Sequence, residues 1–215
     1  MFGFDIADIL INIPITLLAL TVHECAHGWV SYKLGDPTPK YQGRLTLNPL
    51  AHLEPMGTLL MILTGFGWAK PVQVNPRYYK NIKKGMALVA VAGPLSNFLL
   101  AVIGALLLII ISLVVIHIGI ELTTGIMAPL IIFLISFIQR NLGLMIFNLV
   151  PIPPLDGSKV LGMFLPNSIY YKYMQYEQYC MILVMILSFS GGFAWINTIS
   201  MWFYSGIGTI LSFFV

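Results

Sequence analysis

Long apolar runs alternate with short polar segments along this chain. Three of the runs are long enough to cross a bilayer, which takes roughly 20 helical residues, and they lie at about 9–34, 86–116 and 126–150. A fourth apolar stretch, 179–215, is interrupted at Gly191-Gly192. We interpret it as two spans joined in a hairpin, with one long span and an irregular tail as the alternative. The pattern therefore predicts an all-α integral membrane protein, a polytopic helical bundle of about five spans within a range of four to six.

The segment between the first two runs, residues 35–85, is rich in Pro, Gly and Asn and predicts shorter elements. Within it, 56–68 is apolar but too short to span, which is typical of a re-entrant or interfacial piece. Residues 71–76 alternate apolar and polar side chains between two prolines, and this predicts a short edge strand. Beyond the third run, we expect a short helix over 158–165 and an interfacial aromatic segment over 167–178.

The composition indicates lipid as the surrounding solvent. Of 215 residues, 58% are hydrophobic and 9% are charged, whereas a soluble domain carries about 25% charged residues. Eight of the eleven Lys and Arg residues fall between Lys33 and Lys84, which predicts that this segment faces the cytoplasm. Apolar and Pro/Gly stretches interrupt these basic residues, so no nucleic-acid partner is expected. We expect one membrane-embedded domain over 1–215, with its core at 9–165 and C-terminal spans at 179–215.

The strongest chemical signal is an H-E-x-x-H pattern, His23-Glu24-Cys25-Ala26-His27, in the second half of the first run. Helical residues at i and i+4 share one face, so both imidazoles can reach one metal ion. Glu24 lies about 100° round the helix from His23, where it can meet a water on that metal. The alternative is a buried polar cluster held by its own hydrogen bonds. Ionisable groups inside an apolar span are costly and usually functional, which favours the metal.

A third ligand must come from elsewhere, because a catalytic zinc takes three protein ligands and keeps an open position. Asp156 is the best candidate. It follows the Pro-rich break at 151–154, and irregular backbone at membrane depth is tolerated only beside protein or a wet cavity. On spacing alone, an Asp-Gly turn or the N-cap of the next helix is an equal alternative.

These motifs resemble those of the site-2 protease family of intramembrane zinc metalloproteases. Residues 148–157, NLVPIPPLDG, match the family's N-x-x-P-x-P-x-L-D-G pattern, and 92–97, AGPLSN, resemble its G-P-x-x-N element. The similarity covers roughly 15–165. It is with the small prokaryotic branch of the family, which lacks appended PDZ or CBS domains.

The resemblance implies that His23, His27 and Asp156 bind Zn²⁺ and that Glu24 is the catalytic base. It also implies an amide donor for the oxyanion, for which Asn148 is the first choice.

Two further polar residues are interpreted as structural. Asn97 is a second choice for the oxyanion donor, although hydrogen bonding between spans is the favoured interpretation for it. His52 is interpreted as an ordinary loop histidine.

The implied activity is that of a multi-pass endopeptidase of the cell membrane, which hydrolyses peptide bonds of single-span membrane proteins. From His27 to Lys33 is roughly 9 Å of helix, so we expect the site nearer the cytoplasmic face. The predicted strand over 72–75 is expected to pair with the unwound substrate. A homodimer is compatible with the sequence.

Two other functions fit part of the pattern. One is a membrane metal carrier or a non-catalytic metal-binding protein. The other is a different membrane zinc protease that takes a downstream glutamate as third ligand, for which the choices are Glu54, Glu121 and Glu177.

Overall fold

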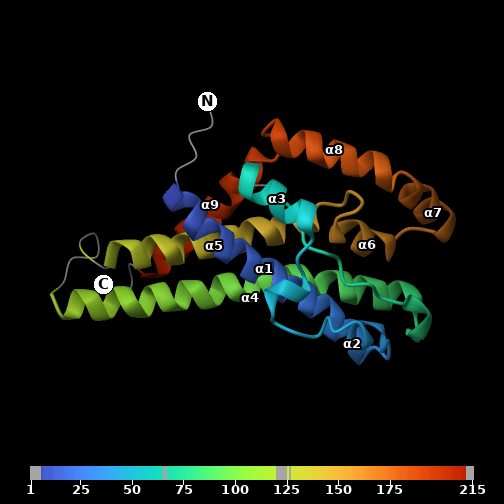
Figure 1. The fold of residues 1–215 in the computed structure, drawn as a ribbon, viewed down its shortest axis with the longest axis horizontal. Coiled ribbons are helices and arrows are strands. Elements are labelled where there is room, and N and C mark those ends of the chain that lie inside the picture. Colours follow the sequence, from blue (N-terminus) through green and yellow to red (C-terminus); the bar gives the residue numbers. More distant parts are fainter. Residues whose placement is uncertain (1–5, 65–66, 120–124, 126, 212–215) are drawn as a thin grey trace.

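The computed structural model describes residues 6–64, 67–119, 125 and 127–211, and all regular elements within these ranges are helices. In Figure 1, α4 and α5 run side by side and α1 crosses them. The elements in chain order are α1 (Ile6–Lys33), α2 (Thr38–Tyr41), the 3-10 helix η1 (Pro49–Ala51), α3 (Pro55–Thr64), the 3-10 helix η2 (Pro76–Tyr78), α4 (Ile82–His117), α5 (Met127–Leu149), α6 (Asp156–Gly162), α7 (Asn167–Gln175), α8 (Glu177–Phe189) and α9 (Ala194–Leu211).

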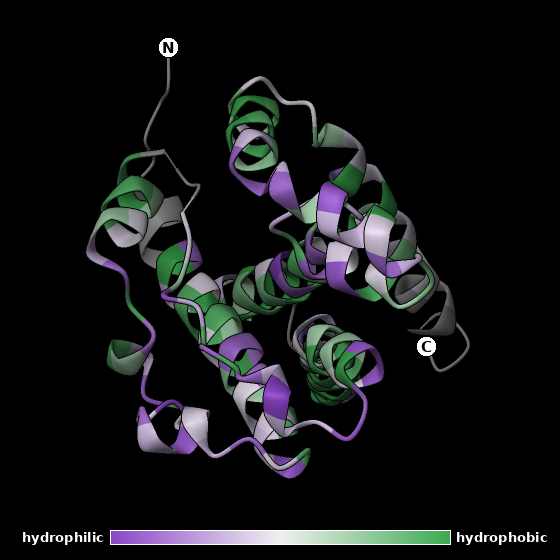
Figure 2. Ribbon diagram, turned by 90° about the vertical axis from the view of Figure 1, so that its right-hand side faces the viewer, coloured by the Kyte–Doolittle hydropathy of each residue, from purple (hydrophilic) through white to green (hydrophobic). Residues whose placement is uncertain are grey.

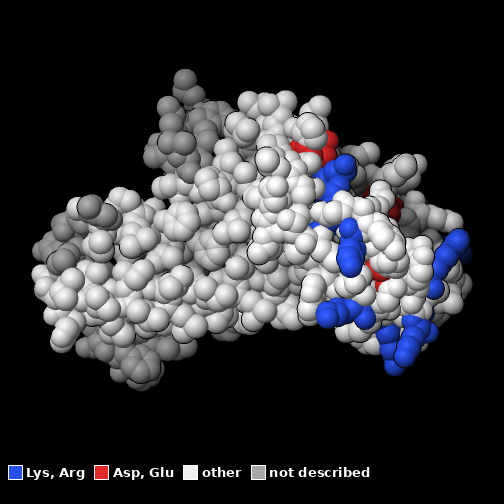
Figure 3. Space-filling model, turned by 60° about the horizontal axis from the view of Figure 1, so that its bottom comes forward, with Lys and Arg blue, Asp and Glu red and all other residues white. Residues whose placement is uncertain are grey.

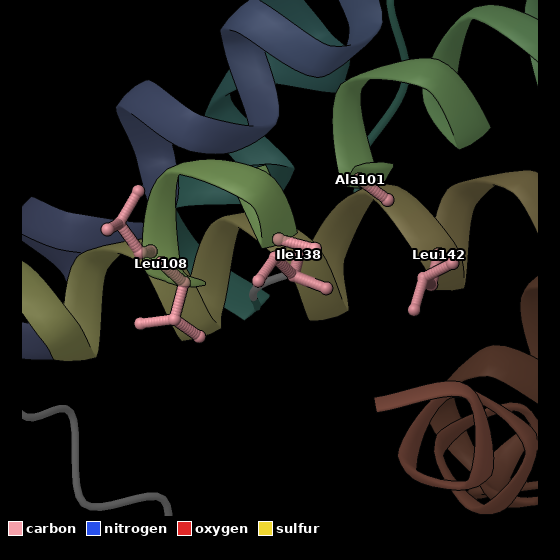
Figure 4. Close-up of a cluster of buried hydrophobic side chains, with 6 residues drawn as sticks. Ala101, Leu108, Ile138 and Leu142 are labelled. Carbon is pink, nitrogen blue, oxygen red and sulfur yellow. The ribbon is translucent and has the colours of Figure 1, made fainter. Parts of the chain in front are cut away.

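The central helix pair is α4 and α5, and both are long and apolar enough to cross a membrane. Small residues on α4 let α5 approach, which is how helices pack when lipid surrounds them. Figure 4 shows the buried cluster between them. Its members are Ala101, Ala105 and Leu108 of α4 and Leu134, Ile138 and Leu142 of α5.

The helices confirm the second and third predicted spans and leave the total number open. α1 is long enough at 28 residues, but the residues of the H-E-x-x-H pattern make it more polar than α4 and α5. The last apolar stretch forms α8 and α9, which are bent by 68° at a short break. Over the described residues, two helices qualify as spans, or three if α8 and α9 form one broken span. The predicted number of about five is therefore not confirmed.

The connection between α1 and α4 contains short helices and, over its described residues, no β-strand. The predicted interfacial piece is α3, whose 10 residues are too few to span. Residues 67–75 are irregular, so the predicted β element is not confirmed. Instead of pairing with a strand, the backbone N–H of Val72 donates to Oε2 of Glu24 at 2.8 Å. Glu121, one of the alternative third ligands, lies outside the described residues.

Charge and hydropathy divide the molecule into two parts. The long helices are largely hydrophobic and the short connecting elements are largely hydrophilic, as Figure 2 shows. On the face drawn in Figure 3, the Lys and Arg side chains gather at one end. In Figure 1 this is the end where α2, α6 and α7 lie. An apolar helical body with one basic end is typical of a membrane protein.

A buried carboxylate joins the end of α1 to the rest of the basic end. Asp36 is fully buried. Its Oδ1 accepts from the N–H of Thr38 at 2.9 Å, and its Oδ2 accepts from the N–H of Asn75 at 2.7 Å and from the Ser31 hydroxyl at 2.8 Å. The Ser31 oxygen also lies 2.6 Å from Oη of Tyr79. One side chain thus fixes both ends of the connection between α1 and α4.

The Asp36 network predicts a pH-dependent contribution to stability. Burial alone raises the pKa of Asp36, but the hydrogen bonds from Thr38, Asn75 and Ser31 outweigh it and hold the pKa below its ordinary value. The stabilisation is therefore complete above the unfolded pKa of about 3.9 and is lost as the pH falls through the lower folded pKa.

We expect Asp36→Asn to lower the free energy of unfolding at pH 7 by about 1–3 kcal/mol, because an uncharged amide replaces a carboxylate that accepts three hydrogen bonds. Thermal unfolding in detergent at pH 7 and pH 3 measures this. The difference in melting temperature between Asp36→Asn and the unmodified chain should be smaller at pH 3 than at pH 7. Glu177→Gln, at an exposed position, is the control. Equal melting temperatures for the two variants at pH 7 would contradict the assignment.

Candidate metal centre

The structure brings His23, His27 and Asp156 together. The two Nε2 atoms are 3.0 Å apart, and they lie 3.2 and 3.1 Å from Oδ2 of Asp156. All three side chains are buried, with 4%, 8% and 6% of their surface exposed. They form a group of ligand atoms close enough to hold one metal ion.

Two helices place the three side chains. His23 and His27 are one turn apart on α1, as the i, i+4 spacing predicts. Asp156 is the first residue of α6. A Cβ added at Gly157 would lie 2.2 Å from the carbonyl oxygen of Leu149. Only glycine therefore allows the start of α6 to pack against the end of α5, which is where Asp156 must lie to face α1.

The outer nitrogen of each imidazole contacts a carbonyl oxygen. Nδ1 of His23 lies 2.6 Å from Oδ1 of Asn97, and Nδ1 of His27 lies 2.6 Å from the backbone oxygen of Val89. A carbonyl oxygen can only accept, so both Nδ1 atoms carry the hydrogen. The Nε2 lone pairs then face each other and the carboxylate of Asp156. Three acceptor atoms at this separation repel unless a cation lies between them, and hydrogen-bonded outer nitrogens are typical of metal-binding histidines.

Asn97 links three helices beneath the site. It is fully buried, and its Nδ2 donates to the backbone oxygen of Ala19 on α1 and to Oδ1 of Asn141 on α5. Both amide hydrogens are thus used between helices, which is the interpretation that the sequence favoured. Its oxygen orients His23, a role that the sequence analysis did not foresee, although a buried asparagine in an apolar run is a visible signal.

The space between the two imidazoles fits a metal ion. A Cβ added at Gly93 of α4 would lie 2.5 Å from Nε2 of both His23 and His27, so a glycine keeps this space open. Nitrogen and oxygen ligands at about 2.0–2.1 Å from a tetrahedral zinc are roughly 3.3–3.4 Å apart. The observed separations of 3.0–3.2 Å are close to that geometry.

Two other predicted residues lie in different surroundings. Glu24 is half-buried, and its Oε2 accepts the hydrogen bond from Val72. Asn148 is half-buried in the last turn of α5, and its Nδ2 donates to the backbone oxygen of Leu144 in the same helix at 3.0 Å. These contacts do not test the catalytic role predicted for either residue.

Sequence reasoning missed two neighbours of the site. Val89 acts through its backbone oxygen, which leaves no signal in the sequence. Nζ of Lys159 lies 3.5 Å from Oδ1 of Asp156, the carboxylate oxygen that does not face the histidines. The i, i+3 spacing would have been the signal for Lys159, but the helix was predicted to begin at 158, whereas α6 begins at Asp156.

Comparison with known proteins gives an independent result. The chain is 44% identical over 171 residues to "Putative zinc metalloprotease YwhC" of Bacillus subtilis, covering 80% of this chain and 76% of that protein. It is 28% identical over 210 residues to "Putative zinc metalloprotease Rip2" of Mycolicibacterium smegmatis, covering 91% and 74%. It is also 27% identical over 194 residues to a Rip2 of Mycobacterium tuberculosis, covering 87% and 68%.

The chain belongs to the site-2 protease family. The resemblance of the motifs is thereby confirmed. The chain is a zinc metalloprotease with membrane-type helices, and Zn²⁺ is its metal. No family model matches the chain, and no solved structure matches it.

Helix α4 approaches the two imidazoles closely at Gly93, which predicts the effect of adding one methyl group there. Gly93→Ala should lower zinc affinity on the order of tenfold or more, because the added Cβ occupies the space between the two Nε2 atoms. Gly143→Ala is the matched control, since its Cβ would meet its nearest neighbour only at 4.0 Å. Competition with a zinc chelator measures the affinity of both variants. Equal affinities would show that the ion does not lie beside Gly93.

Proposed function

We propose that this chain is an intramembrane endopeptidase that cleaves single-span membrane proteins. The observation that carries the proposal is the buried convergence of two Nε2 lone pairs and a carboxylate oxygen on α1 and α6. Because α1 packs against α4, which is a candidate span, the chemistry takes place beside a membrane-crossing helix. A substrate that reaches it from the lipid is the simplest match.

The chain is proposed to cross the cell membrane several times, with its active site nearer the cytoplasmic side. The basic residues at one end of the molecule support this orientation. Lys33 ends α1, and His27 lies about 9 Å before it along the helix.

His23, His27 and Asp156 are the proposed zinc ligands. Zinc supplies Lewis acidity there, which polarises a peptide carbonyl and lowers the pKa of a water molecule. With both imidazoles neutral, the formal charges of Zn²⁺, Asp156 and Glu24 sum to zero, while the positive charge of Lys159, 3.5 Å from Asp156, lies on a side chain that is 33% exposed. This neutrality limits the cost of placing ionised groups at membrane depth.

Glu24 is the proposed general base. Its carboxylate takes a proton from the attacking water and passes that proton to the leaving amine. The hydrogen bond from Val72 to Oε2 orients the carboxylate, and Oε1 is the atom that we assign to the proton.

Asn148 is the proposed donor to the oxyanion that forms at the scissile carbonyl. Its Nδ2 donates one hydrogen to the backbone oxygen of Leu144, and the second amide hydrogen is the one that we assign to the oxyanion. A donor that makes its new hydrogen bond only as charge develops favours the transition state over the bound substrate.

Replacing the proposed base separates catalysis from metal binding. We expect Glu24→Gln to keep zinc and to lower the cleavage rate by about 10²–10⁴-fold, because the amide cannot accept the proton. Asp156→Asn is the companion variant and should lose zinc. The measurements are metal content of the purified chain and cleavage of a panel of single-span segments in proteoliposomes.

The same panel tests the competing function. A chain that moves zinc across the vesicle membrane and cleaves no segment would be a metal carrier and would contradict the proposal. Cleavage by Glu24→Gln at the rate of the unmodified chain would contradict only the role of Glu24.

The irregular segment 67–75 is proposed to hold the unwound substrate through its backbone. Val72 places this segment beside Glu24, and an extended peptide can pair with exposed N–H and C=O groups. Val74→Pro should therefore lower turnover on the order of tenfold without lowering zinc content, because it removes one backbone donor. Gln73→Ala changes a side chain and keeps the N–H, so it serves as the control. Equal turnover of the two variants would count against pairing at Val74.

A further inference from the structure

A small cavity lies between α1, α3 and the connection that joins α1 to α4. Its lining includes Leu20 and Thr21 of α1, His52, Thr58 of α3, and Trp68. It offers about 10 Å³ to the centre of a water-sized sphere, which is close to the minimum that one water molecule needs. The cavity thus has room for one small hydrogen-bonding molecule.

His52, on the wall of this cavity, has a buried nitrogen that lacks a partner. The side chain is 1% exposed. Its Nε2 lies 2.9 Å from the backbone oxygen of Thr46, so Nε2 carries the hydrogen and Nδ1 presents a lone pair. Among the described residues, Nδ1 has no hydrogen-bond partner. A buried acceptor left unpaired is costly, which points to a donor inside the cavity.

Water is the donor that the cavity walls fit. Besides apolar side chains, the lining includes His52, two threonines and the indole of Trp68, and none of these bonds to Nδ1 of His52. The Thr21 hydroxyl donates to the backbone oxygen of Leu17, and its oxygen keeps acceptor capacity. A water that donates to both His52 and Thr21, with the Thr58 hydroxyl as a third neighbour, has the two to four polar partners that buried waters have.

The cavity lies between the two elements that hold Glu24. On the helix side, Leu20 is four residues before Glu24 and therefore on the same face of α1. On the loop side, the backbone oxygen of His52 accepts from the N–H of Lys70 at 2.8 Å. Lys70 is two residues before Val72, whose N–H binds Glu24.

We propose that His52 is a positioning residue for Glu24. Its Nδ1 accepts a hydrogen bond from one buried water, and this water joins the connection between α1 and α4 to Thr21 of α1. This water-mediated contact between His52 and Thr21 keeps the Val72 N–H in hydrogen-bonding position to the Glu24 carboxylate. This inference rests on the proposed role of Glu24.

Two substitutions of His52 separate the contributions of the hydrogen bonds at its two ring nitrogens. His52→Gln keeps a donor near the position of Nε2 for Thr46 and removes the acceptor at Nδ1. His52→Asn keeps an acceptor near the position of Nδ1 and loses the bond to Thr46. His117→Gln, at the exposed end of α4, is the matched control.

The first measurement uses the unmodified full chain, labelled with ¹⁵N at histidine and compared with His52→Gln to assign the His52 signals. We expect an Nδ1 signal of an unprotonated nitrogen that accepts a hydrogen bond. The second measurement is amide hydrogen exchange of the peptide that contains Val72. It should be faster in His52→Gln on the order of tenfold and closer to normal in His52→Asn.

Kinetics complete the test. We expect His52→Gln to keep its zinc and its KM and to lower kcat on the order of tenfold, because a displaced base costs rate more than binding. An Nδ1 signal without a hydrogen bond would overturn the inference even if the His52 variants fail to fold. Normal Val72 exchange and normal kcat in His52→Gln would also overturn it.

The proposed function can be contradicted without contradicting the inference about His52. If the unmodified chain cleaves no segment while the Nδ1 signal and the Val72 exchange are as expected, the water-mediated contact of His52 is supported and the proposed protease function is contradicted.

Discussion

Three electron-rich atoms lie close together inside this protein, where the C-terminal half of α1 faces the start of α6. Nε2 of His23, Nε2 of His27 and Oδ2 of Asp156 lie 3.0–3.2 Å from one another in a buried environment. In a medium of low dielectric constant, such a group is strongly repulsive unless a cation occupies its centre. The need for that cation explains why the largely apolar helix α1 carries two imidazoles and faces a carboxylate from residue 156.

The surrounding contacts maintain this arrangement. Asn97 and Val89 accept hydrogen bonds from the outer imidazole nitrogens, which turns the Nε2 lone pairs inward. Gly93 leaves room for an ion between these lone pairs, and Gly157 lets α6 begin where Asp156 can reach them. Val89, Gly93 and Asn97 all belong to α4 and Gly157 belongs to α6, and Asn97 also bonds to Asn141 of α5. The site therefore depends on the packing of α1, α4, α5 and α6 as one unit.

The sequence was sufficient for features that depend on local spacing. The H-E-x-x-H pattern placed His23 and His27 on one helix face, and the apolar runs gave the ends of α5 to within one residue and those of α4 to within four. Asp156 was identified through a family motif, because spacing alone left a turn or an N-cap equally plausible. Its convergence with the histidines is a tertiary fact that spacing does not encode.

Other features were beyond local reasoning. Residues 67–75 are irregular, and Val72 bonds there to Glu24 across 48 positions, whereas the alternating pattern of the segment suggested a strand. The contribution of Val89 comes from its backbone, so no side-chain signal exists. His52 resembled a loop histidine until the packing of α1 and α3 showed it buried against a cavity.

X-ray absorption at the zinc K edge of the purified chain tests the central claim most directly, because it identifies the atoms bound to the metal. The account predicts zinc with two imidazole nitrogens and additional oxygen ligands, and no sulfur, although Cys25 lies inside the histidine motif. Sulfur in the first coordination sphere, or a single imidazole, would contradict it.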